Sequence, residues 1–252
     1  MKVALIDGDV VAYRFASAEE TAIEWEDGLW TLHADLDAAF VGVAAFINSV
    51  KEEAGCEEVQ VFFSSSTNFR KIVLPTYKSN RKAVRKPMIL AELRKRLMAS
   101  YGSRALEVYG LEADDLLGLN GYRRSSRVIC TIDKDLRTVE GFHYNWDKPE
   151  EGVVKVDARE AALQFYGQVL TGDATDGYKG CPGVGPKTAA KLLASCESST
   201  DMWSAVVKAY EKAGLDEEEA LTQARVAYIL KREGVDYDAQ KEQVIQWTPT
   251  LK

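Results

Sequence analysis

The sequence predicts an α/β protein with a mostly parallel sheet flanked by helices, followed by a helical region. Three short apolar runs that end in polar residues have the character of buried strands, and they are residues 2–7, 58–65 and 127–133. Helical stretches separate these runs, which is the pattern of parallel strands joined by crossover helices. Beyond Asp157 the apolar spacing stays helical to Glu233.

The elements between the strands are predicted from periodicity and turn residues. Residues 21–34 alternate around Asp27-Gly28, a strong hairpin signal, and we expect Trp25 and Trp30 to pair across it. Helical periodicity marks three segments: residues 34–54, 86–101 and 112–124. The last of these opens with acids, which the helix dipole favours in a first turn. A β-rich stretch covers residues 142–157.

Length and composition indicate an ordinary globular protein. The chain has 252 residues, of which 46% are hydrophobic and 28% charged, with a formal net charge of −7. No apolar run is long enough to predict a membrane span. The four cysteines show no CxxC spacing, so we expect reduced thiols in a cytoplasmic protein. We expect one domain over residues 1–156 and a helical region over residues 157–252.

The charges are distributed unevenly along the chain. Residues 70–104 contain eleven Lys and Arg but one acid, Glu92. A basic segment in an acidic protein is an electrostatic footprint for a polyanion such as nucleic acid. The alternative for such a run is a solvated helix face.

Acids follow the predicted strands and open a predicted helix. Nine of them are candidates for metal ligands: Asp7, Asp9, Glu112, Asp114, Asp115, Asp133, Asp135, Asp173 and Asp176. The carboxyl ends of parallel strands meet at one sheet edge, where ligands bind. Oxygen ligands without His or Cys suit Mg²⁺ or Mn²⁺. Several carboxylates fit two such ions, the usual clamp for attack on a phosphodiester. The chain's two histidines, His33 and His143, are not expected to be catalytic.

A glycine-rich turn precedes a predicted helix at residues 183–193. Gly183 and Gly185 allow backbone N–H groups to approach a phosphate, and Pro186 suits the first turn of a helix. Lys187 and Thr188 follow. The pattern is that of a helix-hairpin-helix, about residues 170–195, which binds a duplex backbone without reading its sequence. A tight interhelical turn is the alternative.

These motifs together resemble one nuclease family. "LIDGD", "EADDLLG", "TIDKDL" and "GDATDGYKGCPGVGPKTAAKLL" occur in the order found in the flap endonuclease and 5′–3′ exonuclease family, and the small size is most similar to bacteriophage members. The resemblance implies a PIN-like domain with a helical arch, about residues 70–104, and a helix-hairpin-helix that grips DNA and a K⁺ ion. It implies that eight of the nine acids named above form the metal site; the ninth, Asp9, stands where other members often have a non-acidic residue.

The resemblance also implies roles for residues of the basic segment. Lys78 and Arg81 match the family's cations that face the scissile phosphate. Substrate contacts are implied for a larger set: Arg14, Arg70, Tyr77, Arg85, Gly183, Gly185, Lys187 and Thr188. The ring of Tyr77 is expected either to stack a base of the 5′ strand or to pack within the protein. One departure is that residues 64–66 are serines where many members have an acid. Either the second metal is bound more weakly as a result, or a ligand role moves to Asp9.

The sequence therefore predicts a monomeric, Mg²⁺-dependent 5′ nuclease of the host cytoplasm. Its expected partners are DNA with a 5′ end, nick or flap, and RNA–DNA hybrids, and no membrane. Two other functions stay open at this point. One is a non-catalytic DNA-structure-binding protein on the same scaffold, which the three serines favour. The other is a PIN-type ribonuclease, which would keep the acids but has no need of the helix-hairpin-helix.

Overall fold

Six strands form the main sheet, in the order β5-β4-β1-β6-β7-β8. The computed structural model describes residues 1–249, apart from the side chain of Lys82. The strands are β1 (Val3–Asp7), β4 (Glu58–Phe63), β5 (Ala105–Glu107), β6 (Arg127–Cys130), β7 (Gly141–Tyr144) and β8 (Val153–Val156). β1 runs parallel to β4 and to β6, β4 to β5, and β6 to β7. The predicted α/β class with a mostly parallel sheet is confirmed.

The chain divides into two units, and each is made of several segments. Unit 1 contains residues 1–65, 85–133 and 141–155, and unit 2 contains residues 66–84, 134–140 and those from 156 onward. Residues 250–252 of the predicted helical region lie outside the described residues. Within residues 1–249, no helix has both the length and the hydropathy that a bilayer span requires.

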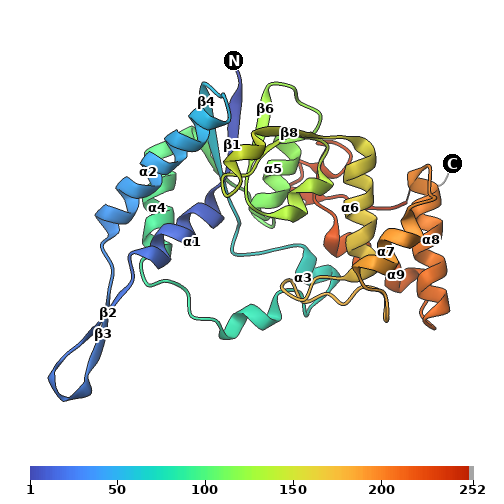
Figure 1. Cartoon of the computed structure of the whole chain (residues 1–252), viewed down its shortest axis with the longest axis horizontal. Helices are drawn as coiled ribbons and strands as arrows, with labels where there is room; N and C mark the ends of the chain where they lie inside the picture. Colours follow the sequence, from blue (N-terminus) through green and yellow to red (C-terminus); the bar gives the residue numbers. More distant parts are fainter. Residues whose placement is uncertain (250–252) are drawn as a thin grey trace. The chain divides into compact units, whose positions relative to one another are not determined.

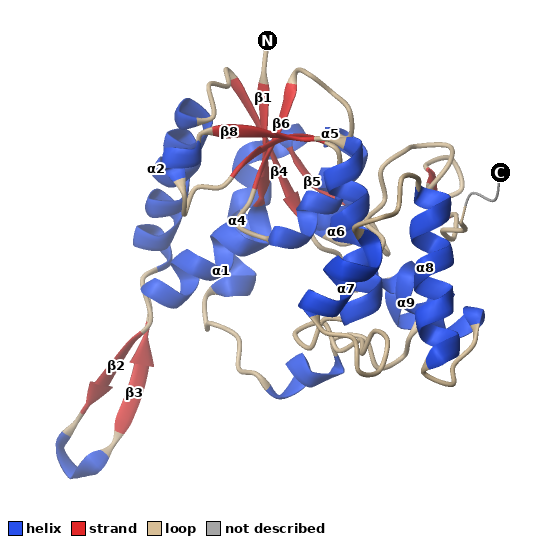
Figure 2. Cartoon of the chain, turned by 45° about the vertical axis from the view of Figure 1, so that its right-hand side comes forward, coloured by secondary structure: helices blue, strands red, loops and turns tan. Residues whose placement is uncertain are grey.

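Helices cover the sheet of unit 1. They are α1 (Gly8–Ala18), α2 (Leu36–Glu53), α4 (Leu90–Tyr101) and α5 (Ala113–Gly121). α1, α2 and α4 pack together on one side, and α5 packs on β1, β4 and β6 (Figures 1 and 2). The core that they enclose is apolar, with Ile6, Val43, Val61 and Leu93 almost fully buried. This burial stabilises the sheet by roughly 25 cal/mol for each Å² of apolar surface removed from water.

Register brings the ends of three strands together. Asp7 lies opposite Phe62 of β4, and Ile6 lies opposite Cys130 of β6. Ser64 and Thr131, which follow these two strands, therefore lie beside the end of β1. The residue after Asp7 has to be a glycine, because a Cβ atom on Gly8 would lie 2.7 Å from the backbone oxygen of Phe62. The predicted convergence of strand ends at one edge is thus present for β1, β4 and β6.

A two-stranded hairpin connects α1 to α2. β2 (Thr21–Glu24) pairs antiparallel with β3 (Trp30–His33), as the Asp27-Gly28 signal predicts. The expected pairing of Trp25 with Trp30 is wrong, because Glu24 lies opposite Trp30. Trp25 is opposite Leu29 instead, since its N–H donates to the Leu29 carbonyl. The connecting turn is therefore longer than the two residues that the sequence suggests.

Helices dominate unit 2. They are α3 (Arg70–Val73), α6 (Ala158–Thr171), α7 (Pro186–Leu193), α8 (Ser199–Lys212) and α9 (Glu217–Ala227), with two short strands, β9 (Tyr237–Asp238) and β10 (Gln243–Val244). Edge-on aromatic contacts link them: Trp247 lies 5.2 Å from Phe165 and 5.3 Å from Trp203 between ring centroids. The predicted glycine-rich turn lies between α6 and α7, in the non-helical residues 172–185, whereas the helical pattern predicted to Glu233 ends at Ala227.

Candidate active site

Asp7 is the buried centre of an acidic group in unit 1. It is the last residue of β1 and caps α1, where its Oδ1 accepts a hydrogen bond from the Val10 N–H at 3.2 Å. The side chain of Asp7 is 2% exposed. Burial, followed by the charges of Asp9 and Asp133, raises the pKa of Asp7 to about 7. The fold thus holds like charges together around a carboxyl group that water cannot solvate.

Thr131 connects two of the predicted acids. Its hydroxyl donates to Oδ2 of Asp7 at 2.9 Å and accepts from the Asp133 N–H at 3.1 Å. It lies at the end of β6, beside the end of β1. Sequence reasoning missed this residue, although a threonine directly after a buried strand and two before a candidate acid is a signal that could have found it.

Ser64 occupies the strand end where an acid was expected. The Ser64 N–H donates to Oδ2 of Asp9 at 2.8 Å, and its Oγ accepts from the Ala113 N–H at 2.9 Å. Arg94 joins the group, with Nε 3.2 Å from Oδ1 of Asp9 and Nη2 donating to the Ser64 carbonyl at 2.7 Å. Arg94 was missed because it lies on α4, thirty residues from the serines in sequence. The Arg94 guanidinium therefore holds Asp9 close to Ser64.

The acids at the start of α5 have a structural task. Glu112 is the N-cap, and it exchanges hydrogen bonds with Asp115 in a capping box. Oδ2 of Asp115 accepts from the Glu112 N–H at 3.1 Å. Glu112 and Asp115 are both buried, and Asp114 is partly exposed between them. The predicted acidic first turn is confirmed.

The other three predicted acids belong to unit 2. Asp135 lies in a short 3₁₀ helix, Lys134–Thr138, and accepts from Nε2 of Gln168 at 2.5 Å. Oδ1 of Asp173 accepts from the N–H groups of Thr175 and Asp176 at 2.6 and 3.1 Å. All three acids lie near Tyr178. Burial, followed by the charges of Asp135, Asp173 and Asp176, raises the pKa of that phenol.

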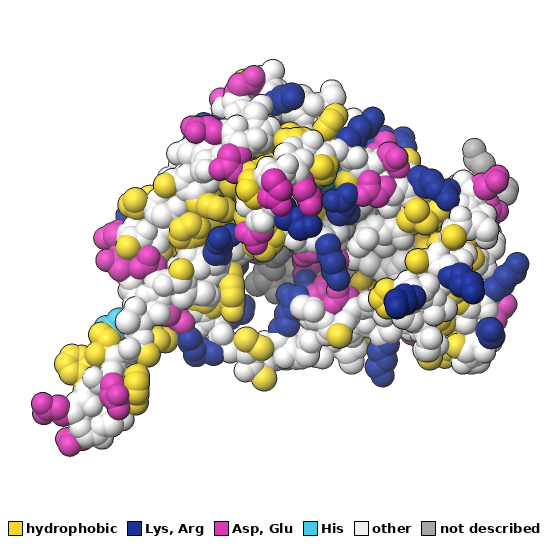
Figure 3. Space-filling view, in the orientation of Figure 1, with side chains coloured by type: hydrophobic (Ala, Val, Ile, Leu, Met, Phe, Trp, Pro, Cys, Tyr) yellow, Lys and Arg dark blue, Asp and Glu magenta, His cyan; other side chains and the backbone are white. Residues whose placement is uncertain are grey.

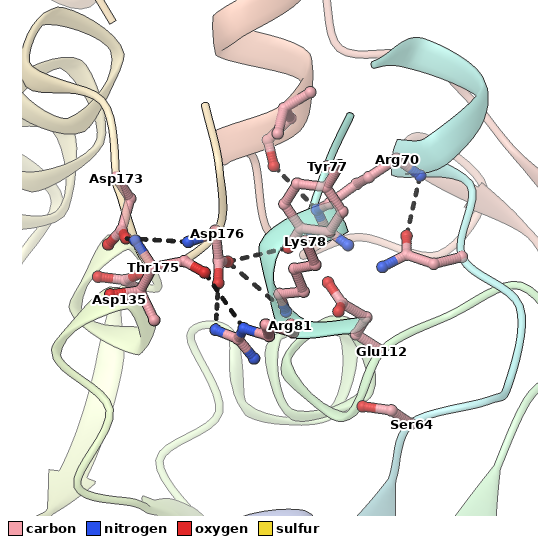
Figure 4. A network of polar contacts seen from close by, with 12 residues as sticks. Ser64, Arg70, Tyr77, Lys78, Arg81, Glu112, Asp135, Asp173, Thr175 and Asp176 are labelled. Carbon is pink, nitrogen blue, oxygen red and sulfur yellow. Dashed lines mark hydrogen bonds and ion pairs between the residues drawn. The ribbon is translucent and has the colours of Figure 1, made fainter. Parts of the chain in front are cut away.

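Asp176 holds the two predicted catalytic cations (Figure 4). Its carboxylate forms an ion pair with Nη2 of Arg81 and lies 3.5 Å from Nζ of Lys78. Two hydrogen bonds to main-chain carbonyls support the same contact. The Lys78 N–H donates to the Asp176 carbonyl at 2.8 Å, and Nε of Arg81 donates to the Thr175 carbonyl at 3.2 Å. Lys78 and Arg81 are thus both paired with Asp176 in this structure.

A tight backbone approach shapes the loop that carries Asp173 and Asp176. Gly172 and Gly180 lie at its two ends, with φ of +68° and +66°. A Cβ atom on Gly180 would lie 2.2 Å from the Gly172 nitrogen, so neither position accepts a side chain. The glycines therefore close the loop, and its residues Thr175 and Asp176 contact residues 77–81.

The glycine-rich turn leads into α7 as predicted. Gly185 is the N-cap and Pro186 the first helical residue. Gly183 has φ of +76°, whereas Gly185 is in the ordinary extended region at −94°. Lys187 and Thr188 are exposed in the first turn, while Ala189 and Leu193 are buried beneath them. The N-terminus of α7 is thus open to an anion.

Similarity to known proteins extends over the whole chain. A family profile described as 5′–3′ exonuclease, N-terminal resolvase-like domain, matches residues 2–158. The chain belongs to this 5′–3′ exonuclease family. It is 26% identical to the exodeoxyribonuclease of Enterobacteria phage T3, over 98% of this chain and 93% of that one. It is 30% identical to DNA polymerase I of Bacillus caldotenax, over 76% of this chain but 23% of the polymerase.

Solved structures share the fold. The flap endonuclease of bacteriophage T5, solved in a complex with DNA and metal ions, superposes with a TM-score of 0.65 over 90% of this chain and 89% of that one, at 14% identity. The catalytic core of Rad2, in a complex with DNA substrate, superposes with a TM-score of 0.51 at 17% identity, over 99% of this chain and 83% of that one. The family fold is therefore present in both units of this member.

Two predicted substrate contacts are wrong. Arg70 is buried, and its guanidinium donates to the carbonyls of Val226 and Tyr228 at 2.9 and 2.7 Å. It anchors the end of α9 and cannot reach a phosphate. Tyr77 is also buried, and its hydroxyl donates to Oδ2 of Asp176 at 3.0 Å. Its ring has no free face for a base.

The other predicted arginines are partly exposed and paired in unit 1. Nη1 of Arg14 is 2.9 Å from Oδ1 of Asp147, and its guanidinium lies 5.3 Å from the Phe46 ring centre. Arg85 donates to both carboxylate oxygens of Glu20, at 2.8 and 2.5 Å. Arg14 and Asp147 are both about half exposed, so their pair contributes less than about 1 kcal/mol, whereas the two-point contact of Arg85 with Glu20 is the stronger kind of ion pair.

The donor set fits a hard divalent cation. Every candidate side chain offers oxygen, and in unit 1 the acids lie near enough to raise the pKa of Asp7. Within residues 1–249, no three His, Cys, Asp or Glu side chains are gathered closely enough to hold a metal ion. Side-chain rotations would therefore have to accompany binding, and rotamer changes of this kind are common at binding sites.

Proposed function

We propose that this 5′ nuclease hydrolyses DNA phosphodiester bonds with the help of Mg²⁺ or Mn²⁺ at the acidic sheet edge. The observation that carries the proposal is Asp7, buried at the end of β1 with its pKa raised to about 7 by burial and by neighbouring acids. Such an arrangement costs stability unless a cation binds there. Oxygen ligands favour magnesium or manganese over zinc.

The acids of each unit would hold the metal, two ions in all. In unit 1 the ligands are drawn from Asp7, Asp9, Glu112, Asp114, Asp115 and Asp133, and in unit 2 from Asp135, Asp173 and Asp176. A bound divalent ion would supply a water of lowered pKa and neutralise charge on phosphoryl oxygens. Thr131 holds the Asp7 carboxylate in one orientation through its hydrogen bond.

Lys78 and Arg81 would stabilise negative charge that develops on the scissile phosphate. Both are paired with Asp176 in the structure, so the phosphate would take the place of that carboxylate. If Asp176 turns to a metal ion, the same movement releases the two cations. Binding of the metal and arrival of the phosphate would then favour each other.

Duplex DNA would bind at the N-terminus of α7. The backbone around Gly183 and Gly185, with Lys187 and Thr188, offers N–H, ammonium and hydroxyl donors to phosphates, and a K⁺ ion would fit the turn's carbonyls. Arg14 and Arg85 would add phosphate contacts. We propose DNA with a 5′ end, nick or flap, and RNA–DNA hybrids, as substrates, acted on by a monomer in the host cytoplasm.

Cleavage of 5′-labelled DNA with and without Mg²⁺ tests the proposal. Asp133→Asn should lower the cleavage rate by at least roughly 100-fold, because it removes a metal ligand. Its affinity for the same duplex, measured in EDTA by fluorescence anisotropy, should stay near that of the wild type. Glu150→Gln, at an exposed acid of the same unit, serves as the control. Equal loss of cleavage and affinity in Asp133→Asn would indicate a role in folding.

A non-catalytic DNA-structure-binding protein is the second candidate, and Ser64 favours it. That strand end carries a hydroxyl bonded to the Ala113 N–H where a metal ligand was expected. A panel of blunt, recessed, nicked, flapped, RNA and hybrid substrates separates the candidates. Binding without any metal-dependent product on the panel would support the binding protein, and preferential cleavage of RNA would support a ribonuclease.

A further inference from the structure

The hairpin formed by β2 and β3 is exposed along most of its length. All four residues of β2 are exposed, and the hairpin projects beyond the ends of α1 and α2 (Figures 1 and 2). An isolated two-stranded hairpin is marginally stable in water. Nothing in the proposed nuclease chemistry uses it.

Large apolar side chains cover this hairpin. Ile23, Trp25, Leu29 and Trp30 are between 38% and 61% exposed. Strand alternation places Ile23, Trp25 and Leu29 on one face, since Trp25 is opposite Leu29. The Trp25 indole is held in place, because its Nε1–H donates to Oγ1 of Thr31 at 2.6 Å. An ordered apolar strip of this kind on a protein surface is typical of a binding site.

The same segment is strongly acidic. Residues 19–37, which we call the acidic hairpin, contain seven Asp and Glu, and no Lys or Arg occurs between Arg14 and Lys51. Two acids at its base are paired within unit 1, Glu20 with Arg85 and Asp37 with Arg96. Near the tip, Glu24, Glu26 and Asp27 form no ion pair with any described residue. Figure 3 shows acidic and apolar side chains side by side on the hairpin.

The negative charge of the acidic hairpin determines which kind of surface can bind the apolar strip. DNA and anionic lipid surfaces are repelled by uncompensated carboxylates. A second copy that used the same hairpin would bring like charges together. A basic protein surface is attracted, and exposed tryptophans are the residue type that most often dominates such interfaces.

We propose that the acidic hairpin docks a separate protein whose surface has Lys and Arg side chains around an apolar pocket. The pocket takes the strip of Ile23, Trp25 and Leu29, and the basic rim faces Glu26 and Asp27 in the connecting turn. The docking holds the nuclease to its partner and leaves the basic residues 70–104 for DNA.

Selection of short random peptides displayed on the wild-type protein tests this. The enriched peptides should combine Lys or Arg with apolar residues, and their affinity should fall as salt is raised. In fluorescence anisotropy, Trp25→Ala/Leu29→Ala and Glu26→Lys/Asp27→Asn should each weaken binding by at least roughly tenfold. The charge variant keeps both tryptophans, so the test survives if the first variant loses the hairpin.

Matched controls lie elsewhere in unit 1. Tyr109→Ala removes another exposed aromatic side chain, and Glu150→Lys/Glu151→Lys reverses two exposed acids, and both should bind the peptides like the wild type. The hairpin variants should cleave and bind DNA normally. Four results would overturn the proposal: no hairpin-dependent peptide, enriched peptides without basic residues, DNA affinity changed by the hairpin variants, or hairpin-dependent self-association in sedimentation.

Discussion

At the scale of single residues, the buried Asp7 carboxylate lowers stability at neutral pH and is also a predicted metal ligand. Its carboxylate accepts two hydrogen bonds, yet burial outweighs them and the pKa rises to about 7. In the unfolded chain the same group has a pKa near 3.8. Protons therefore bind the folded state more tightly. The contribution of Asp7 to stability is most favourable below pH 3.8, and it is lost as pH rises through about 7.

Asp7→Asn should therefore stabilise the protein in EDTA. The gain in free energy of unfolding over the wild type should grow from about pH 4 to pH 7, at roughly 1.4 kcal/mol per pH unit, and then level off. Urea unfolding at several pH values measures this. Glu26→Gln, which removes an exposed acid, should show no such slope. A variant less stable than the wild type at pH 7.5 would contradict the burial argument.

At the scale of elements, the loop between α6 and α7 depends on two glycines. Gly172 and Gly180 combine positive φ with backbone contact, which positions Asp173 and Asp176. The sequence shows these glycines and acids, but their contact with residues 77–81 comes from a segment almost a hundred residues earlier. Local pattern cannot reveal such pairing, so the ion pairs of Lys78 and Arg81 were not predicted.

Gly180→Ala should lower the free energy of unfolding by more than about 2 kcal/mol, because its Cβ would meet the Gly172 backbone at a positive φ. Gly167→Ala is the matched change. It lies inside α6 with nothing within 4 Å of its Cβ, and it should stabilise by about 0.5–1 kcal/mol. Urea unfolding compares the two. Equal effects of the two substitutions would show that the approach of residues 172 and 180 is not maintained.

At the scale of the whole molecule, acidic and basic side chains are concentrated in different segments of the chain. The net charge of −7 is equalled by the seven acids of the acidic hairpin alone, and residues 70–104 stay basic. Each unit contains predicted metal ligands. Each unit also contains a group suited to bind a phosphate, either a cationic side chain or the N-terminus of a helix. Metal binding should therefore couple to the folding of the chain, because the unfolded state scatters these acids.

Mg²⁺ should raise the melting temperature of the wild type above its value in EDTA. The shift follows from binding to the folded state alone, about 2.7 kcal/mol at a concentration 100 times Kd. Differential scanning fluorimetry measures it, with ionic strength matched by NaCl. The double variant Asp7→Asn/Asp133→Asn should lose the part of the shift that comes from the ion of unit 1. An equal shift in wild type and variant would mean that the ions bind elsewhere.

The sequence by itself determined the α/β class, the three central strands, the hairpin and the acids at the strand ends. These follow from local periodicity and from turn and cap residues such as Asp27, Gly28 and Pro186, whose preferences need no distant partner. Tertiary structure decided which side chains are available. Arg70 and Tyr77 are buried, Thr131 orients Asp7, and Arg94 holds Asp9, because burial and hydrogen bonding depend on residues that only the fold brings together.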